Sequence, residues 1–173
     1  CNEADLHQRD GHWGWRGDAV DIALLALGCK LGFPREAALD AHPQVNEIPF
    51  ESEHQYAASF HQAPDAIHVF VKGAPERVLA MCSDVRRGEL EAAALEMAAR
   101  GFRVLALAEG PGEDGADPAR APSEPGGLTF LGFVGMIDPL RPGVREAVQA
   151  CHAAGIDVSM VTGDHAVTAL AIA

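Results

Sequence analysis

The chain has 173 residues, 48% of them hydrophobic and 22% charged, and its formal net charge at pH 7 is −12. The hydrophobic fraction is enough to bury a core, which excludes a disordered chain. The negative charge argues against nucleic acid as a partner, because binding a phosphate backbone requires a basic surface.

Cysteine and histidine spacing gives no sign of a disulfide framework or a metal centre. The four cysteines lie far apart, and the eight histidines form no HExxH or Cys-x-x-Cys cluster. We therefore expect free thiols in a reducing compartment and no metal site built from these residues. No apolar run reaches the roughly 20 residues that are needed to span a bilayer.

The first third of the chain predicts a polar lead-in followed by two helices. Residues 1–16 are polar and are expected to be extended. Asp18 is a good N-cap for a helix that ends at Gly32. The apolar stripe of this helix consists of Val20, Leu24, Leu27 and Leu31. A shorter helix is predicted over 34–41, and the segment 45–50 then leads into the strands.

Two β-branched and aromatic runs, 56–61 and 66–71, predict a hairpin that turns at Pro64-Asp65. Lys72 follows the second run, just before a glycine turn and a new helix that begins near Pro75. A cation placed where a strand ends and helix N–H groups begin is suited to meet an anion. An ordinary surface lysine at a turn is the alternative.

The second half changes character at residue 128. A helix over 89–100 and a strand over 102–108 are followed by a loop over 109–127 with five glycines and four prolines, which we expect to be mobile and to end the antiparallel part. From 128 the pattern predicts one parallel βαβ unit. Its parts are a strand over 128–137, a helix over 142–154, a strand over 156–161 and a further element from 164.

Polar residues follow both strands of this predicted parallel unit. Asp138 comes after the first strand, and Thr162, Gly163 and Asp164 come after the second. Parallel strands place their ligands at their carboxyl ends, where carboxylates and a hydroxyl suit Mg²⁺ and a phosphoryl group. The alternative is that Asp138 is a turn residue and Asp164 a helix N-cap.

Three motifs in this order resemble those of the P-type ATPases, the ion pumps that pass through an aspartyl-phosphate. They are Lys-Gly-Ala-Pro-Glu at 72–76, Gly-Met-Ile-Asp-Pro-Leu-Arg-Pro at 135–142 and Val-Thr-Gly-Asp at 161–164. The likeness covers nearly the whole chain. It looks closer to the calcium and sodium/potassium branch than to the copper and zinc branch, and it leaves the transported ion open.

The resemblance implies an α+β fold in two parts. Residues 1–127, with the loop 109–127, would form the nucleotide-binding domain, an antiparallel sheet flanked by helices. Residues 128–173 would be a truncated parallel α/β segment, similar to the haloacid-dehalogenase (HAD-like) fold, that begins the phosphorylation domain. The implied ligands are ATP or ADP with Mg²⁺. The implied partners are the remaining phosphorylation, actuator and membrane domains of a pump, at whose cytoplasmic face this fragment would lie.

The resemblance also implies a nucleotide site. Phe50 matches a phenylalanine that stacks on adenine, and Lys72 with Gly73 matches the bottom of the nucleotide cleft. Arg103 matches an arginine that reaches the phosphates. Asp21 matches a glutamate that approaches the adenine amino group, and it is one methylene shorter.

The matched residues nearest the phosphoryl group lie in the last third. Asp138 would help to position phosphate, and Thr162 and Gly163 would contact the phosphoryl group beside Asp164. In the nucleotide half, His54-Gln55 stands where the family has Arg-Lys. The loss of those cations predicts weaker ATP affinity.

The chain contains no Asp-Lys-Thr-Gly-Thr segment, whose aspartate accepts the phosphoryl group in the family. It also lacks the later Gly-Asp-Gly-x-Asn-Asp segment. We therefore expect nucleotide binding without turnover and no catalytic residue in this fragment. Two alternatives remain: a non-catalytic interaction domain that has lost nucleotide binding, and a free-standing HAD-like phosphohydrolase, for which no nucleophile is in place.

Overall fold

In the computed structural model, the described residues are 4–9, 12–83, 85–137, 140–162 and 166–172. The chain divides into two compact units. The first comprises residues 1–87 and 105–134, and the second comprises 88–104 and 135–173.

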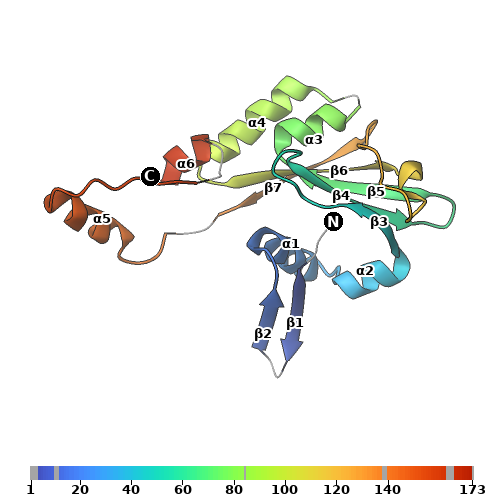
Figure 1. Ribbon diagram of the computed structural model, residues 1–173, viewed down its shortest axis with the longest axis horizontal. Coiled ribbons are helices and arrows are strands. Elements are labelled where there is room, and N and C mark those ends of the chain that lie inside the picture. Colours follow the sequence, from blue (N-terminus) through green and yellow to red (C-terminus); the bar gives the residue numbers. More distant parts are fainter. Residues whose placement is uncertain (1–3, 10–11, 84, 138–139, 163–165, 173) are drawn as a thin grey trace. The chain divides into compact units, whose positions relative to one another are not determined.

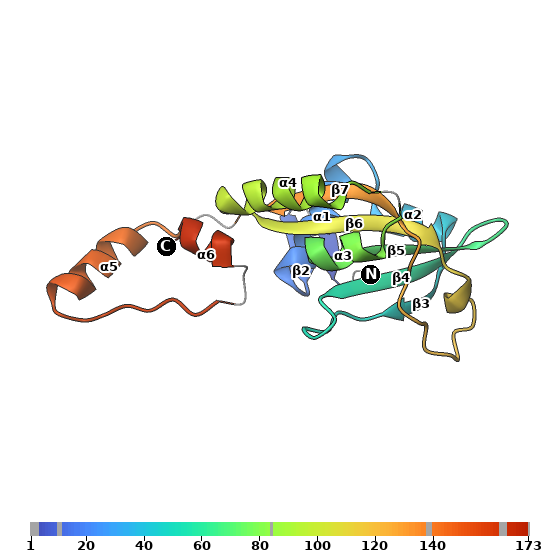
Figure 2. The same ribbon diagram turned by 90° about the horizontal axis from the view of Figure 1, so that it is seen from above.

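The first unit is built around a five-stranded sheet with the order β3-β4-β5-β6-β7 (Figure 2). The strands of this sheet are β3 (Gln44–Ile48), β4 (Tyr56–Gln62), β5 (Ile67–Gly73), β6 (Arg103–Pro111) and β7 (Thr129–Met136). The three pairs from β3 to β6 are antiparallel, which confirms the predicted hairpin of β4 and β5. His61 lies opposite His68 next to the turn of that hairpin.

One face of the sheet carries the hydrophobic core. Alternate residues of β4 and β5 point to this face, as the period of a strand requires. The core side chains are Tyr56, Ala58, Phe60, Ile67, Val69, Val71, Val78, Met81, Ala106, Ala108 and Leu128. Helix α3 (Pro75–Met81) covers this face with Val78 and Met81 (Figure 1). Its start at Pro75 confirms the helix that was predicted after the glycine turn.

Helix α1 (Ala19–Lys30) lies on the opposite side of the sheet from α3 (Figure 1). Asp18 is its N-cap as predicted, because the side-chain oxygen of Asp18 accepts a hydrogen bond of 2.8 Å from the Val20 N–H. Gly32 follows the helix with a φ of +85°, a conformation that favours glycine. The shorter helix α2 (Arg35–Ala41) is also present where the sequence predicted it.

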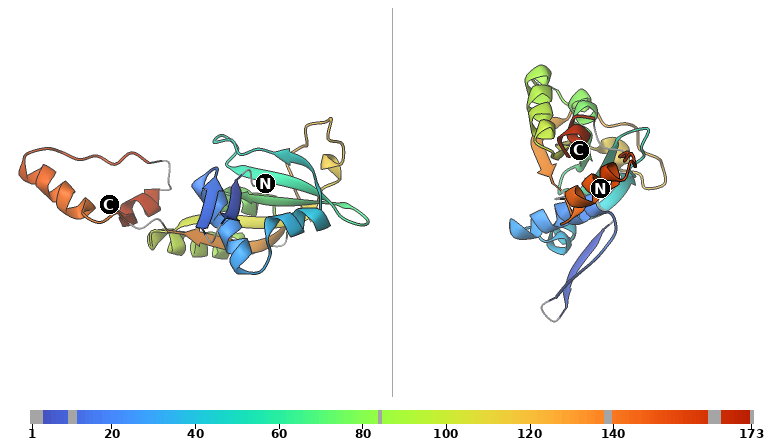
Figure 3. Two further views of the ribbon diagram at one scale, coloured as in Figure 1. Left: turned by 90° about the horizontal axis from the view of Figure 1, so that it is seen from below. Right: turned by 90° about the vertical axis from the view of Figure 1, so that its left-hand side faces the viewer.

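The predicted extended lead-in is a two-stranded hairpin. Strand β1 (Asp5–Arg9) pairs antiparallel with β2 (His12–Arg16), and Figure 3 shows this hairpin extending from α1. The Asp10-Gly11 dipeptide between the strands is a sequence signal for such a hairpin. The sequence analysis missed it because the two strands are short and mostly polar, although Trp13 and Trp15 alternate with polar residues and glycine in the second strand.

The loop between β6 and β7 is shorter than predicted, because β6 continues to Pro111 and a 3₁₀ turn, η1 (Glu113–Gly115), follows it. The rest of the loop is fixed to the edge strand β3. The Asn46 amide donates hydrogen bonds of 3.0 Å to the carbonyl oxygens of Asp117 and Arg120. The loop is therefore held at its two ends by β6 and β7 and between them by its hydrogen bonds to β3.

The predicted parallel βαβ unit is not formed by the described residues, and this corrects the sequence analysis. The strand expected over 128–137 is present as β7, but it joins the sheet of the first unit beside β6. Residues 156–161, expected to be its parallel partner, have no strand structure. A strand requires hydrogen bonds from a neighbour, and no described segment supplies them to 156–161. The division of domains at residue 128 stays a prediction.

The second unit contains three helices among its described residues. They are α4 (Arg87–Ala99), α5 (Val144–Ala153) and α6 (Ala166–Ile172). Helices α4 and α5 confirm the helices predicted over 89–100 and 142–154. The buried Thr168 hydroxyl of α6 donates a hydrogen bond of 3.1 Å to the Phe102 carbonyl. Among the described residues, no helix is long and apolar enough to cross a membrane.

Candidate functional site

Two segments with predicted site residues meet where β4 begins and β5 ends: residues 49–55, which include Phe50, and the Lys-Gly-Ala-Pro-Glu motif at 72–76. Tyr56 lies opposite Gly73 in the antiparallel register. The Ala74 N–H donates a hydrogen bond of 2.9 Å to the Gln55 carbonyl. The turn that follows Phe50 is therefore joined through the backbone to the Lys-Gly-Ala-Pro-Glu segment.

The turn before β4 presents an exposed aromatic ring. Phe50 follows β3, and 61% of its surface is exposed. The Glu51 carbonyl closes the turn by accepting hydrogen bonds from the N–H groups of His54 (3.1 Å) and Gln55 (2.8 Å). Gln55 has a φ of +59°, a left-handed conformation that is uncommon for a residue with a side chain. Phe50 thus lies directly before a hydrogen-bonded turn, with a large part of its surface open for stacking.

Gly73 permits the close approach of the two segments. A Cβ atom at this position would lie 2.5 Å from the Gln55 carbonyl oxygen and 2.8 Å from the Tyr56 Cα. Both are backbone atoms that cannot move aside like a flexible side chain. A larger residue at position 73 would therefore separate β4 from β5 at the candidate site.

A third predicted site residue, Asp21, reaches the same end of β5 from helix α1. The Lys72 ammonium forms an ion pair and hydrogen bond with the Asp21 carboxylate. Only 11% of the Lys72 side chain and 16% of the Asp21 side chain are exposed. Desolvation makes such charges costly unless they are paired, so each group keeps the other in place.

On the other face of the sheet, Arg77 of α3 forms a second ion pair, with Glu124 of the β6–β7 loop. The Arg77 guanidinium also lies 5.7 Å from the centre of the Tyr56 ring, in cation–π range. Tyr56 is buried, and burial raises the pKa of its hydroxyl, with a further increase from the Glu124 charge that Arg77 opposes. The end of the sheet thus carries one ion pair on each face.

The remaining predicted site residues are not brought into this arrangement by the described contacts. Arg103 begins β6 and is exposed, but it belongs to the second unit, so its part in a shared site stays a prediction. Thr162 is exposed in irregular backbone after α5. Asp138, Gly163 and Asp164 lie outside the described residues.

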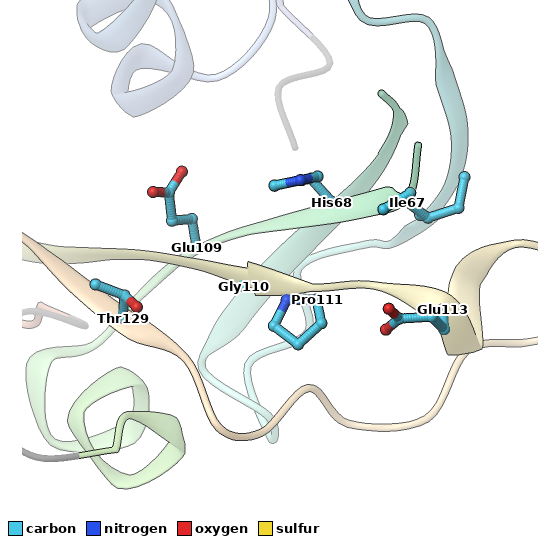
Figure 4. Close-up of a pocket in the computed structure, with 8 residues that line it drawn as sticks. Ile67, His68, Glu109, Gly110, Pro111, Glu113 and Thr129 are labelled. Carbon is cyan, nitrogen blue, oxygen red and sulfur yellow. The ribbon is translucent and has the colours of Figure 1, made fainter. Parts of the chain in front are cut away.

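A separate pocket lies at the opposite end of β5, near His68 rather than Lys72. Figure 4 shows the His68 ring and the Glu109 carboxylate on one side of the strands and Glu113 near Pro111. The other residues that line it are Ala66, Ile67, Gly110 and Thr129. Two carboxylates disfavour a phosphate here. Within the described parts of the chain, no three His, Cys, Asp or Glu side chains are placed to share a metal ion.

A cluster of polar residues around His61 lies on the α1 side of the sheet. The His61 Nδ1 donates to the His42 carbonyl oxygen at 2.9 Å, and the Ser59 hydroxyl is 2.9 Å from the His61 Nε2, which accepts from it. The His61 ring also contacts Phe70 edge-on, at 5.6 Å between ring centres. Burial lowers the pKa of His61 below its usual value of 6.5, although the hydrogen bond to His42 opposes this shift.

This lowered pKa makes folding sensitive to acid. The unfolded chain protonates His61 more readily than the folded chain, so the free energy of unfolding decreases as pH falls below about 6.5 towards the folded pKa. We expect a smaller loss of stability between about pH 7.5 and about pH 5.5 when His61 is replaced by glutamine. Urea unfolding at both pH values measures this. The exposed His68→Gln variant is the control, and an equal loss in wild type and His61→Gln would contradict the prediction.

Comparisons with known proteins agree with the motifs. The model of the P-type ATPase cytoplasmic domain N matches residues 1–143. The chain is similar to the cation-transporting ATPase pma1 of Synechocystis, with 41% identity over 100% of this chain and 20% of that protein. It is 34% identical to a calcium-transporting ATPase of Bacillus subtilis, over 100% of this chain and 21% of that protein.

A mammalian protein gives a similar result. The sodium/potassium-transporting ATPase subunit alpha-2 of Sus scrofa is 40% identical, over 91% of this chain and 18% of that protein. The chain therefore spans about a fifth of the length of these relatives.

Proposed function

This chain belongs to the P-type cation ATPases and corresponds to their cytoplasmic domain N, and from that premise we propose that it binds ATP beside Phe50, Lys72 and Gly73. The observation that carries this proposal is the backbone junction of the segments that carry Phe50 and Lys72, with Gln55 bonded to Ala74 and Tyr56 opposite Gly73. It places an exposed aromatic ring and a lysine on segments that are joined at one end of the sheet.

In the proposed complex, the adenine ring stacks on Phe50. Stacking of a base on an exposed ring contributes about 1–3 kcal/mol, and the 61% exposed Phe50 needs no rearrangement of the core to provide it. Lys72 forms the polar floor of the site, and Gly73 lets the ligand approach the backbone. Arg103 is proposed to contact the phosphates. Asp21 is proposed to hold Lys72 in position at the site.

Mg²⁺ is proposed to accompany the phosphate oxygens of ATP, because it prefers oxygen ligands. Asp138, Thr162, Gly163 and Asp164 are proposed to lie near the phosphoryl group in the whole protein. That protein would use ATP hydrolysis to move a cation across a membrane, with this domain at the cytoplasmic face. The domain would present ATP to an aspartate that is not in this sequence, so the fragment itself would bind nucleotide without becoming phosphorylated.

Calorimetric titration with ATP and ADP, with and without Mg²⁺, tests the proposal. Saturable binding of one nucleotide per chain at millimolar concentration or below supports it. No binding at several millimolar would favour the alternative, an interaction domain that has lost its ligand. Incubation with labelled ATP and acid precipitation tests the second part, since an acid-stable phosphorylated chain would contradict binding without turnover.

A further inference from the structure

We infer that helix α1 carries a docking seam for the α1 helix of a second copy of this chain, which packs against it in the antiparallel direction. The seam consists of Val20, Leu24, Leu27 and Leu31, the last of which caps the helix. This surface lies outside the proposed nucleotide site, so the inference does not depend on ATP binding.

The first observation is the spacing of the seam residues. They follow one another at intervals of four, three and four residues. A narrow apolar seam of this kind is typical of coiled coils, in which the side chains of one helix pack between those of another. A helix that packs only on its own sheet more often carries a wider apolar stripe. The pattern therefore indicates contact with a second helix.

The second observation is that the sheet does not cover the seam. No residue of α1 is buried, and 38% of Leu27 and 64% of Leu31 are exposed. Asp21, which reaches Lys72 on the sheet, lies about 90° around the helix from the middle of the seam, at about 100° per residue. The seam therefore faces to the side of the sheet, and its C-terminal half is open to solvent.

The third observation is that small residues flank the seam. Ala23 is exposed on one side of it. On the other side, a Cβ atom at Gly28 would meet only the Phe33 carbonyl oxygen within 4 Å outside the helix itself, at 3.1 Å. No side chain covers either position. Small residues let the axes of two helices approach to the roughly 8–10 Å that close helix packing requires.

The charges at the ends of α1 favour a second copy as the occupant of the seam. Asp18 precedes the helix and Lys30 ends it, and both side chains are exposed. In antiparallel packing, Lys30 of each copy comes next to the end of the other helix that holds Asp18. This gives two pairs of opposite charge, whereas parallel packing would place like charges together. The seam is thus complementary to itself in the antiparallel direction.

Sedimentation equilibrium of the chain from about 20 µM to about 1 mM tests the inference. About 0.15 M NaCl limits the repulsion between two chains of net charge −12 to a range of about 8 Å. The average mass should rise from 18.2 kDa towards twice that value. Because a 12-residue helix buries a small area, we expect a dissociation constant of about 50–500 µM.

Leu31→Ser should weaken the dimer at least about fivefold, because both copies lose an apolar side chain from the seam. Its melting curve should stay close to that of the unchanged chain, since Leu31 is 64% exposed. The matched control is Leu95→Ser, which removes another exposed leucine, in α4, and should leave the dimer unchanged. Lys30→Gln should weaken the dimer about two- to threefold through the loss of its opposite-charge pairs.

Three results would overturn the inference. A mass that stays at 18.2 kDa up to about 1 mM would show that a second copy is not the occupant. A dimer that Leu31→Ser leaves intact, or that Leu95→Ser weakens equally, would use a different surface. A dimer that Lys30→Gln strengthens would have like charges side by side, which excludes the antiparallel direction.

Discussion

Replacing Phe50 with alanine is expected to weaken ATP binding about 5- to 150-fold, because the ring is the stacking surface of the proposed site and stacking contributes about 1–3 kcal/mol. Since the ring is 61% exposed, its removal leaves no cavity in the core. Thermal stability should therefore stay close to that of the unchanged chain. Calorimetric titration with ATP gives the affinity, and a melting curve of the same sample gives the stability.

Phe33→Ala is the matched control for this experiment. Phe33 is another exposed phenylalanine, at 74%, and it lies in the connection between α1 and α2. Its removal should leave ATP affinity unchanged. If Phe50→Ala retained full affinity, adenine stacking at this ring would be excluded. If both variants lost affinity equally, the effect would belong to surface hydrophobicity and not to the site.

Replacing Gly115 with alanine is expected to cause a large loss of folding stability. A Cβ atom there would lie 2.1 Å from Cδ1 and 2.2 Å from Cγ of the Phe60 ring. Phe60 is only 2% exposed and is enclosed by the core, so its ring has no free space to move into. Overpacking of this kind costs about 2–3 kcal/mol, which corresponds to a decrease of roughly 5–10 °C in Tm.

Gly126→Ala provides a control in the same loop, because no heavy atom lies within 4 Å of a Cβ at that position. It should be nearly neutral. In the double variant Gly115→Ala with Phe60→Leu, the smaller leucine side chain should relieve part of the clash. The loss of stability in the double variant would then be smaller than the sum of the losses in the two single variants. A Gly115→Ala variant as stable as the unchanged chain would show that η1 does not rest on Phe60.

Local signals in the sequence were sufficient for much of the fold. The Asp18 N-cap, Pro75 at a helix start and Gly101 at a helix end each mark a boundary near the observed one. The hairpin of β4 and β5 also follows from neighbouring segments, because a short turn brings its strands together. These features depend on hydrogen bonds and backbone preferences within a few residues of each other.

The candidate site was predicted only in part. The motifs identified Phe50, Lys72 and Gly73, and the antiparallel register then joins their two segments. No sequence signal indicated that Arg77 and Glu124, 47 residues apart, form an ion pair. Asp21 was singled out as a ligand contact, which stays a prediction, and no sequence signal indicated that it pairs with Lys72, 51 residues away.

The sequence alone determined the family, the helices and the central hairpin of this protein, because each rests on residues that are close together in the chain. Tertiary structure decided the place of β7, the absence of a strand over 156–161 and the pairing of charges around Lys72. A helix satisfies its own backbone hydrogen bonds, but a strand or an ion pair needs a distant partner. Which partner it finds depends on the packing of the whole domain.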